Sequence, residues 1–254
     1  GAIAEKIGVD TVLVSVMHAN NETGTIQPIE RVAEICAERG VAFHTDAVQS
    51  AGKISIDVQA LPVSMLALSA HKLYAPKGVG ACYIRKGLEV AWQAVGGHQE
   101  RGRRAGTENV AGIVGFGKAC ELAAREMAEE AARLCQLRDR LQEGILSRIP
   151  GTYVNGSLEQ RLPNLLNVSF RDVEGESIIF GLDVEGIAAS TGAACTAGSL
   201  DPSHVLLALG LPWREAQSAV RFSLGHGNDE GEIDQVLEVL PGLVERLRAS
   251  SRAG

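Results

Sequence analysis

Two short stretches decide the fold: Val41-Ala-Phe-His-Thr-Asp-Ala-Val-Gln49 and Ser64-Met-Leu-Ala-Leu-Ser-Ala-His-Lys72. Each begins with an apolar, strand-like run and then changes to polar residues. Asp46 and Lys72 therefore come after two separate strands. Because open α/β sheets place ligand chemistry at the carboxyl ends of their strands, we expect both side chains at one edge of one sheet.

The surrounding sequence alternates short apolar runs with helical patterns, as is typical of a mostly parallel sheet. Residues 29–39 fit a helix, because Pro28 stands at its first turn and Gly40 just past its end. The other expected elements are strands at 12–17, 41–45, 64–68, 79–84, 165–170, 186–189 and 220–224, and helices at 177–182, 202–209 and 230–248. The fold class is therefore α/β.

The stretch 109–148 is dominated by Ala, Glu, Leu and Arg, which predicts one long helix followed by another. We place a domain boundary inside this stretch, near residue 125. Residues 1–125 are then expected to form part of a large domain around the mostly parallel sheet, without the N-terminal portion of that domain. Residues 126–254 are expected to form a smaller α+β domain.

The composition excludes several classes of protein. The 254 residues are 45% apolar and 22% charged, and no run of eighteen apolar residues predicts a membrane span. The net charge of −7 gives no surface-wide field for nucleic acid. The five cysteines include no Cys-x-x-Cys pair, so neither a disulfide framework nor a zinc site is expected. With no secretory leader at the start, these features favour a cytoplasmic protein.

Lys72 and Asp46 form the first candidate pair. Lys72 follows an apolar strand, so we expect a partly buried amine with a lowered pKa and increased nucleophilicity; an exposed loop lysine is the alternative. Asp46 at a strand end needs a cationic partner, and a pyridinium nitrogen would be one; a helix N-cap is the alternative. Gln49, three residues on, would donate to the hydroxyl of the same ring.

Cys195 lies in Ser190-Thr-Gly-Ala-Ala-Cys-Thr-Ala-Gly-Ser199, a run of small residues that favours neither helix nor strand. A thiol on such a loop can be delivered to a substrate and withdrawn, so Cys195 is the predicted nucleophile. The other cysteines fall within apolar helix or strand patterns, where buried and inert thiols are expected: Cys36, Cys82, Cys120 and Cys135.

A single arginine and a group of three arginines complete the candidate residues. Arg221 opens the strand Arg-Phe-Ser-Leu-Gly225, where a planar guanidinium would hold a substrate carboxylate; a surface arginine is the alternative. Arg101, Arg103 and Arg104 form a local basic group in an otherwise acidic chain. They would either form a solvated loop or help to present the Cys195 loop to an acidic partner.

Together these segments resemble the cysteine desulfurases of the nitrogenase-cluster and iron-sulfur-cluster type. These enzymes belong to the class V aminotransferases, with the pyridoxal-phosphate fold of type I. The resemblance covers nearly the whole chain. The matching stretches are 18–24 (His-Ala-Asn-Asn-Glu-Thr-Gly), 44–49 (His-Thr-Asp-Ala-Val-Gln), 69–72 (Ser-Ala-His-Lys), 96–109, 190–199 and 221–225.

The resemblance assigns a role to each candidate residue. Lys72 would form the internal Schiff base with pyridoxal 5'-phosphate, and Arg221 and Asn21 would bind the substrate. Cys195 would take the sulfur of L-cysteine as a persulfide and leave L-alanine. The residues that would hold the cofactor are Asn21, Asp46, Gln49, Ser69, His71, Lys72 and Thr107, the last acting on the phosphate of the neighbouring subunit.

The resemblance also implies partners. It implies a homodimer and an iron-sulfur scaffold or sulfur-carrier protein that collects the sulfur, with no resident metal, although Cys195 could contact a cluster during transfer. Members of this family carry about a hundred or more further residues before the point that matches Gly1, including a phosphate loop. Three alternatives stay open: a selenocysteine lyase, another class V pyridoxal-phosphate enzyme, and a non-catalytic fragment that acts as a binding or scaffold subunit.

Overall fold

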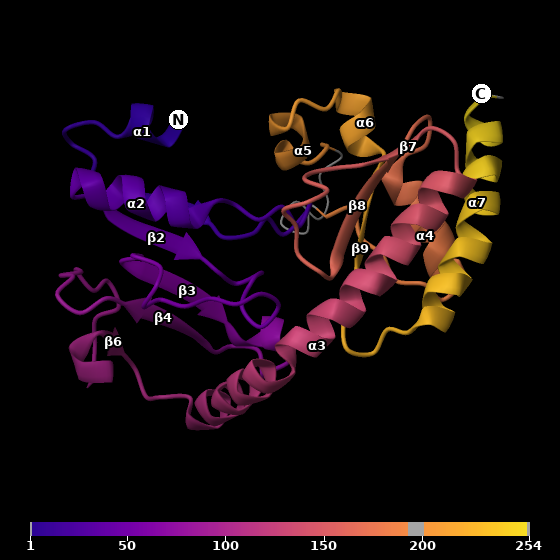
Figure 1. Cartoon of the computed structure of the whole chain (residues 1–254). Coiled ribbons are helices and arrows are strands. Elements are labelled where there is room, and N and C mark those ends of the chain that lie inside the picture. The colour runs from indigo at the N-terminus through magenta and orange to yellow at the C-terminus, as the bar shows by residue number, and fades with distance from the viewer. Residues whose placement is uncertain (1, 193–200, 253–254) are drawn as a thin grey trace. The chain divides into compact units, whose positions relative to one another are not determined.

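The computed structural model describes residues 2–192 and 201–252, which form two compact units (Figure 1). The first unit comprises residues 1–18 and 27–127, and the second comprises residues 19–26 and 128–254. Helix α3 (Val110–Arg148) continues from the first unit into the second. Among the described residues, no helix is long and apolar enough to cross a membrane.

The first unit is built on a four-stranded sheet of order β1-β2-β3-β4. Strands β1, β2 and β3 run parallel, and β4 closes the sheet as an antiparallel edge strand. Its elements are α1 (Ala2–Lys6), β1 (Leu13–Met17), α2 (Ile29–Arg39), β2 (Ala42–Asp46), β3 (Met65–Ser69), the 3-10 helix η1 (Ala70–Leu73), β4 (Gly80–Ile84), β5 (His98–Gln99), the 3-10 helix η2 (Glu100–Gly102) and β6 (Arg104–Ala105).

Helix α2 covers one face of this sheet. Its apolar residues, including Ile29, Val32 and Cys36, pack against Phe43 of β2 and Val63 in one buried cluster. The helix ends at Gly40, which has φ +65° and donates its backbone N–H to Ala37 O. This packing holds β2 and β3 in the parallel register that brings their carboxyl ends together.

The second unit contains a three-stranded antiparallel sheet of order β7-β8-β9. All six residues of β8 are buried, because both faces of this central strand are covered. On one face Leu166, Val168 and Phe170 join the core that α3, α4 and α7 complete. The elements are β7 (Thr152–Val154), β8 (Leu165–Phe170), α4 (Gly175–Val184), α5 (His204–Ala208), α6 (Trp213–Gln217), β9 (Ala219–Ser223) and α7 (Glu230–Arg252).

The other face of β8 explains why residues 19–26 belong to the second unit. Asn167 Nδ2 donates to Glu22 O at 3.0 Å, and Ser169 Oγ donates to Glu215 O at 3.0 Å. Gly24 adopts φ +75°, and a Cβ there would lie 3.2 Å from Leu165 Cβ. The segment is therefore fixed on β8, whereas the sequence grouped it with residues 1–125. The domain assignment itself stays a prediction.

Two expected elements are wrong. The stretch 109–148 forms one helix of 39 residues, because no Gly or Pro occurs between residues 118 and 143 to end it. Residues 186–189 form no strand; only Ser190 makes an isolated bridge, with Arg221. The remaining expected strands and helices are present, with ends shifted by a few residues.

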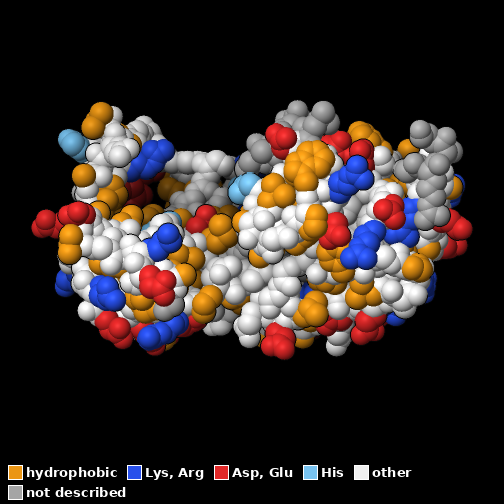
Figure 2. Space-filling view, turned by 90° about the horizontal axis from the view of Figure 1, so that it is seen from above, with side chains coloured by type: hydrophobic (Ala, Val, Ile, Leu, Met, Phe, Trp, Pro, Cys, Tyr) orange, Lys and Arg blue, Asp and Glu red, His pale blue; other side chains and the backbone are white. Residues whose placement is uncertain are grey.

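Charges of both signs are interspersed over the face of the molecule in Figure 2. Lys and Arg side chains stand among Asp and Glu side chains on this face, and no large area carries one sign.

Candidate cofactor and substrate sites

The carboxyl ends of β2 and β3 bring four candidate residues to one edge of the sheet. Asp46 is the last residue of β2 and pairs with Ala67 of β3, two residues before Ser69. The chain then turns directly into η1, which carries His71 and Lys72. This arrangement matches the expectation drawn from the two apolar runs.

Hydrogen bonds fix part of this edge. Ser69 Oγ and His71 Nδ1 lie 2.9 Å apart, so the hydroxyl and the imidazole face one another. Asp46 Oδ1 accepts from the backbone N–H of Val48 at 2.8 Å and so caps the turn that follows β2. No helix starts in this part of the chain, which the structure describes, so the alternative of a helix N-cap is wrong. The second carboxylate oxygen is not used by that bond. Capping and binding of a cationic ligand are therefore compatible at Asp46.

The two further residues expected at the cofactor differ in position. Gln49 is half-buried in the turn that follows β2, close in sequence to the sheet edge. Thr107 is exposed in the segment between β6 and α3, outside the group of residues at the strand ends. The structure therefore brings Asp46, Ser69 and Lys72 together but does not add Thr107 to them.

The burial expected for Lys72 is wrong, because this side chain is exposed. A neighbouring lysine, Lys53, has a perturbed amine: burial, helped by the positive charge of Lys72, lowers the pKa of Lys53 to about 8. Lys53 Nζ donates to the backbone O of Lys72 at 3.5 Å. Sequence reasoning missed Lys53, because it is an unremarkable lysine in the turn after Gln49.

In the second unit the structure joins Asn21 and Arg221. Arg221 lies in β9, and its Nη1 donates to Asn21 O at 2.9 Å and to Gly192 O at 3.4 Å. Burial lowers the pKa of Arg221, and the nearby carboxylate of Glu22 opposes this effect. The sequence alone did not single out Glu22, whose carboxylate is buried in the fold. Cys195 lies outside the described residues.

The expectation that four cysteines are buried is only partly correct. Cys36 is buried and Cys135 half-buried, but Cys82 and Cys120 are exposed. Cys82 stands on the edge strand β4, and Cys120 on an uncovered side of α3. Partial desolvation still raises the pKa of both exposed thiols above the ordinary value, which lowers their thiolate fraction.

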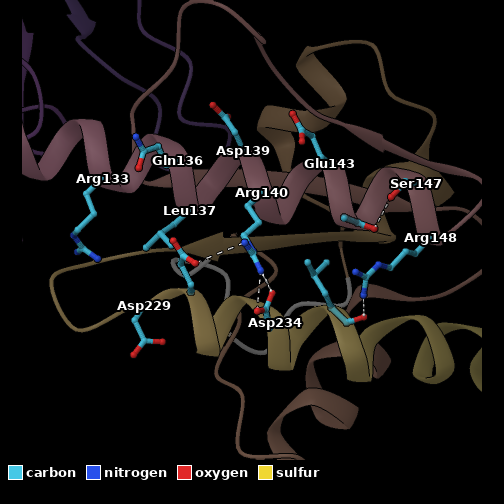
Figure 3. A pocket seen from close by; sticks show the side chains of 13 residues that line it. Arg133, Gln136, Leu137, Asp139, Arg140, Glu143, Ser147, Arg148, Asp229 and Asp234 are labelled. Carbon is cyan, nitrogen blue, oxygen red and sulfur yellow. Dashed lines mark hydrogen bonds and ion pairs between the residues drawn. The ribbon is translucent and has the colours of Figure 1, made fainter.

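A cavity of about 950 Å³ between α3 and α7 contains none of these candidate residues (Figure 3). Its cationic side chains are already occupied by the protein. Arg140 Nη2 donates to both carboxylate oxygens of Asp234, at 2.6 and 2.8 Å, and Arg148 Nη1 donates to Leu237 O at 3.0 Å. These contacts hold α3 to α7, and we assign this cavity a structural role.

Comparison with known proteins decides the family, because the model of the class V aminotransferases matches residues 1–236. The chain belongs to the class V aminotransferase family. Class V relatives include a cysteine desulfurase of Nostoc sp., 52% identical over 242 residues, which cover 95% of this chain and 60% of the relative. A cysteine desulfurase IscS 1 of Archaeoglobus fulgidus is 51% identical over 98% of this chain and 65% of its own length.

Similarity to solved structures confirms the expected fold. A NifS-like protein has a TM-score of 0.89 and 40% identity, and the match covers 97% of this chain and 64% of the other. SspA in complex with cysteine has a TM-score of 0.74 and 36% identity, over 88% and 61% of the two chains. The chain thus spans about 60% of the length of the relatives that it matches.

Proposed function

We propose that this chain is the greater part of a pyridoxal-phosphate-dependent cysteine desulfurase that converts L-cysteine to L-alanine. The observation that carries the proposal is the meeting of Asp46 with Ser69, His71 and Lys72 at the carboxyl ends of two parallel strands. Proteins named cysteine desulfurase share about half of their aligned residues with this chain, which supports the same reaction.

The chemistry of these side chains fits pyridoxal 5'-phosphate. Asp46 offers a carboxylate for a protonated pyridine nitrogen, Lys72 an amine for an aldehyde, and Ser69 with His71 a hydroxyl and an imidazole for a phosphate. Gln49, with Asn21 of the second unit, would contact the ring hydroxyl. When bound, this group supplies an electron sink that stabilises negative charge at the α-carbon of an amino acid.

The residues of the chain would then act as follows. Arg221 holds the carboxylate of cysteine, and Lys72 Nζ takes the proton from its α-carbon. The Cys195 thiolate attacks the substrate sulfur, so a sulfur–sulfur bond forms while the bond from sulfur to the β-carbon breaks. The electron pair of that bond remains on the β-carbon, which takes up a proton, and Lys72 Nζ returns a proton to the α-carbon, so that alanine is formed. The sulfur remains on Cys195 as a persulfide.

The first test measures cofactor binding and product together. The wild-type protein, mixed with pyridoxal phosphate, should gain a visible absorbance band that Lys72→Ala loses. It should release alanine from cysteine and form a persulfide that Cys195→Ala cannot form. A Cys195→Ala protein with full cysteine activity would contradict the persulfide step. A preference for selenocysteine would favour the lyase, and no band in the wild type would favour the non-catalytic fragment.

We infer further that the enzyme is a cytoplasmic homodimer that passes its sulfur to an iron-sulfur scaffold or a carrier protein. The exposed position of Thr107 supports a role in the neighbouring subunit's phosphate site. Coexpression of Thr107→Val with Lys72→Ala tests this role. If Thr107 acts on the partner's cofactor, the mixed dimer contains one intact site and regains activity that neither parent has. If activity does not return, Thr107 does not act across the interface.

A further inference from the structure

Glu22 is a buried carboxylate that the proposed reaction does not use. Glu22 is only 4% exposed. The backbone on both sides of it is fixed, since Glu22 N donates to Asn20 Oδ1 at 2.9 Å and Glu22 O accepts from Asn167 Nδ2 at 3.0 Å. The turn that carries Glu22 is therefore attached to the buried face of β8, which leaves the side chain little freedom to move.

The carboxylate itself has an incomplete environment. Among the described residues, none forms a hydrogen bond with Glu22 Oε2, although this atom is buried. A buried polar atom without a partner costs free energy, so its retention needs a reason other than packing. Arg221 Nε is buried and lacks a hydrogen bond in the same way, and Glu22 acts electrostatically on this guanidinium. The two side chains thus form an electrostatic pair within the second unit, without a hydrogen bond between Glu22 Oε2 and Arg221 Nε.

Both members of the pair contact residues 190–192, which we call the loop neck because the stretch with Cys195 follows it. The main chains of Arg221 and Ser190 exchange two hydrogen bonds, of 2.6 and 3.2 Å, and Arg221 Nη1 reaches Gly192 O. Gly192 adopts φ +94°, and a Cβ there would lie 3.4 Å from Glu22 Oε2. Glu22 thus lies against the loop neck, and Arg221 binds the loop neck by hydrogen bonds.

We propose that Glu22 is a positioning residue for sulfur transfer, which acts through Arg221 and Gly192. Its carboxylate acts electrostatically on the guanidinium of Arg221 and forms the surface against which Gly192 lies. The position of the loop neck, and hence the starting point of the chain that leads to Cys195, depends on this contact. The inference rests on the proposed function, because it assigns Glu22 to the step in which Cys195 accepts sulfur.

The kinetic test uses Glu22→Gln, which removes the charge and keeps the shape, in the protein loaded with pyridoxal phosphate. We expect kcat for persulfide formation to fall at least tenfold, with a smaller rise in KM for cysteine, because Glu22 also acts on Arg221, the proposed binding group for the substrate carboxylate. Glu185→Gln, an exposed glutamate of the same unit, should change neither constant. An unchanged kcat, or a loss that appears only in KM, overturns the inference.

A double-mutant cycle separates this contact from a general loss of stability. Gly192→Ala disturbs the same contact from the other side, so its effect on kcat should not add to that of Glu22→Gln. Gly186→Ala provides the matched control, because Gly186 also has positive φ, +76°, but a Cβ there would meet nothing within 4 Å. Effects of Glu22→Gln and Gly192→Ala that multiply overturn the inference. If Glu22→Gln does not fold, the comparison of Gly192→Ala with Gly186→Ala tests the inference on its own. A fall in kcat in Gly192→Ala but not in Gly186→Ala supports it, and equal values of kcat overturn it.

Hydrogen exchange provides a readout that needs neither cofactor nor activity. The amides of Ser190 and Arg221 should exchange at least tenfold faster in Glu22→Gln, because their mutual hydrogen bonds open more often. The amide of Val168 in the centre of β8 should keep its rate. Unchanged exchange at Ser190 overturns the inference even in an active enzyme. A wild type without a visible band contradicts the proposed function but leaves the exchange result valid.

Discussion

The edge of the sheet in the first unit and the loop neck in the second unit carry candidate residues of opposite character. At the sheet edge Asp46, His71 and Lys72 are exposed, and no tertiary contact of their charged groups is needed to hold the fold. At the loop neck Glu22 is buried and Arg221 is half-buried, with hydrogen bonds to two other segments. Substitutions at the sheet edge should therefore reduce activity without reducing the free energy of unfolding. Substitutions of Glu22 or Arg221 should reduce both.

The largest effect is expected at Lys72, where this separation should be most complete. Lys72→Ala should reduce alanine formation at least about a thousandfold, since the residue both binds the cofactor and moves the α-proton. The free energy of unfolding should change by less than about 0.5 kcal/mol, because the side chain is exposed. Urea unfolding and an alanine assay on one preparation provide both values.

Lys77→Ala is the matched control for this prediction, since Lys77 is another exposed lysine a few residues further along. It should alter neither activity nor stability. A large loss of stability in Lys72→Ala would show that the sheet edge, like the loop neck, depends on its functional residues.

The second effect, at Arg221, should show coupling. Arg221→Met loses the hydrogen bonds to Asn21 O and Gly192 O and removes the positive charge that acts on the buried carboxylate of Glu22. We expect a loss of about 2–3 kcal/mol in the free energy of unfolding, together with a large rise in KM for cysteine. Denaturant unfolding and steady-state kinetics measure the two effects.

Arg171→Met serves as the comparison within the same unit. Its side chain is 61% exposed and pairs with Glu215 at 3.6 Å, so the loss should stay below about 1 kcal/mol. Equal losses for Arg171→Met and Arg221→Met would remove the distinction between buried and exposed arginines.

The third effect separates the two roles of Asp46. Asp46→Asn keeps an oxygen that can accept from Val48 N, so stability should change by less than about 0.5 kcal/mol. Loss of the negative charge should nevertheless weaken binding of pyridoxal phosphate by about tenfold or more. Asp46→Ala should show the same loss of binding and a further loss of about 1 kcal/mol in stability. Cofactor titration measures the binding role of Asp46, and thermal unfolding measures its capping role. Unchanged binding in Asp46→Asn would show that Asp46 only caps the turn.

The same comparison shows what the sequence can predict. Strands β2 and β3 follow from local apolar runs, and their parallel pairing follows from the α/β pattern, so the sheet edge was found from local signals. The helix-favouring composition of residues 109–148 predicted helix correctly but two helices instead of one, although no Gly or Pro occurs between residues 118 and 143 to end α3.

Glu22 and Lys53 could not be found in this way. The surroundings of Glu22 are formed by Arg221, about two hundred residues later in the chain, and by Gly192, which has positive φ. Only the folded chain brings these residues next to Glu22. Lys53 differs from other lysines only because folding buries it beside Lys72. Long-range proximity and burial, unlike apolar periodicity, have no local signature in one sequence.

Lys53 gives the smallest expected effect and tests whether the sheet edge carries any cost in stability. Burial and the charge of Lys72 lower its pKa from 10.5 to about 8 in the folded chain. The unfolded chain therefore binds more protons than the folded chain between these values, and stability rises with pH through this window. Lys53→Met removes the cost, so it should be more stable than the wild type by about 1 kcal/mol near neutral pH.

That advantage should shrink as the pH rises from about 8 and disappear near 10.5, where the unfolded amine also loses its proton. Urea unfolding of both proteins at several pH values measures the difference directly. Lys77→Met, at an exposed lysine, should give the same small difference from wild type at each pH. An advantage of Lys53→Met that does not depend on pH would point to better apolar packing of the methionine, and the charge of Lys53 would then impose no cost at the sheet edge.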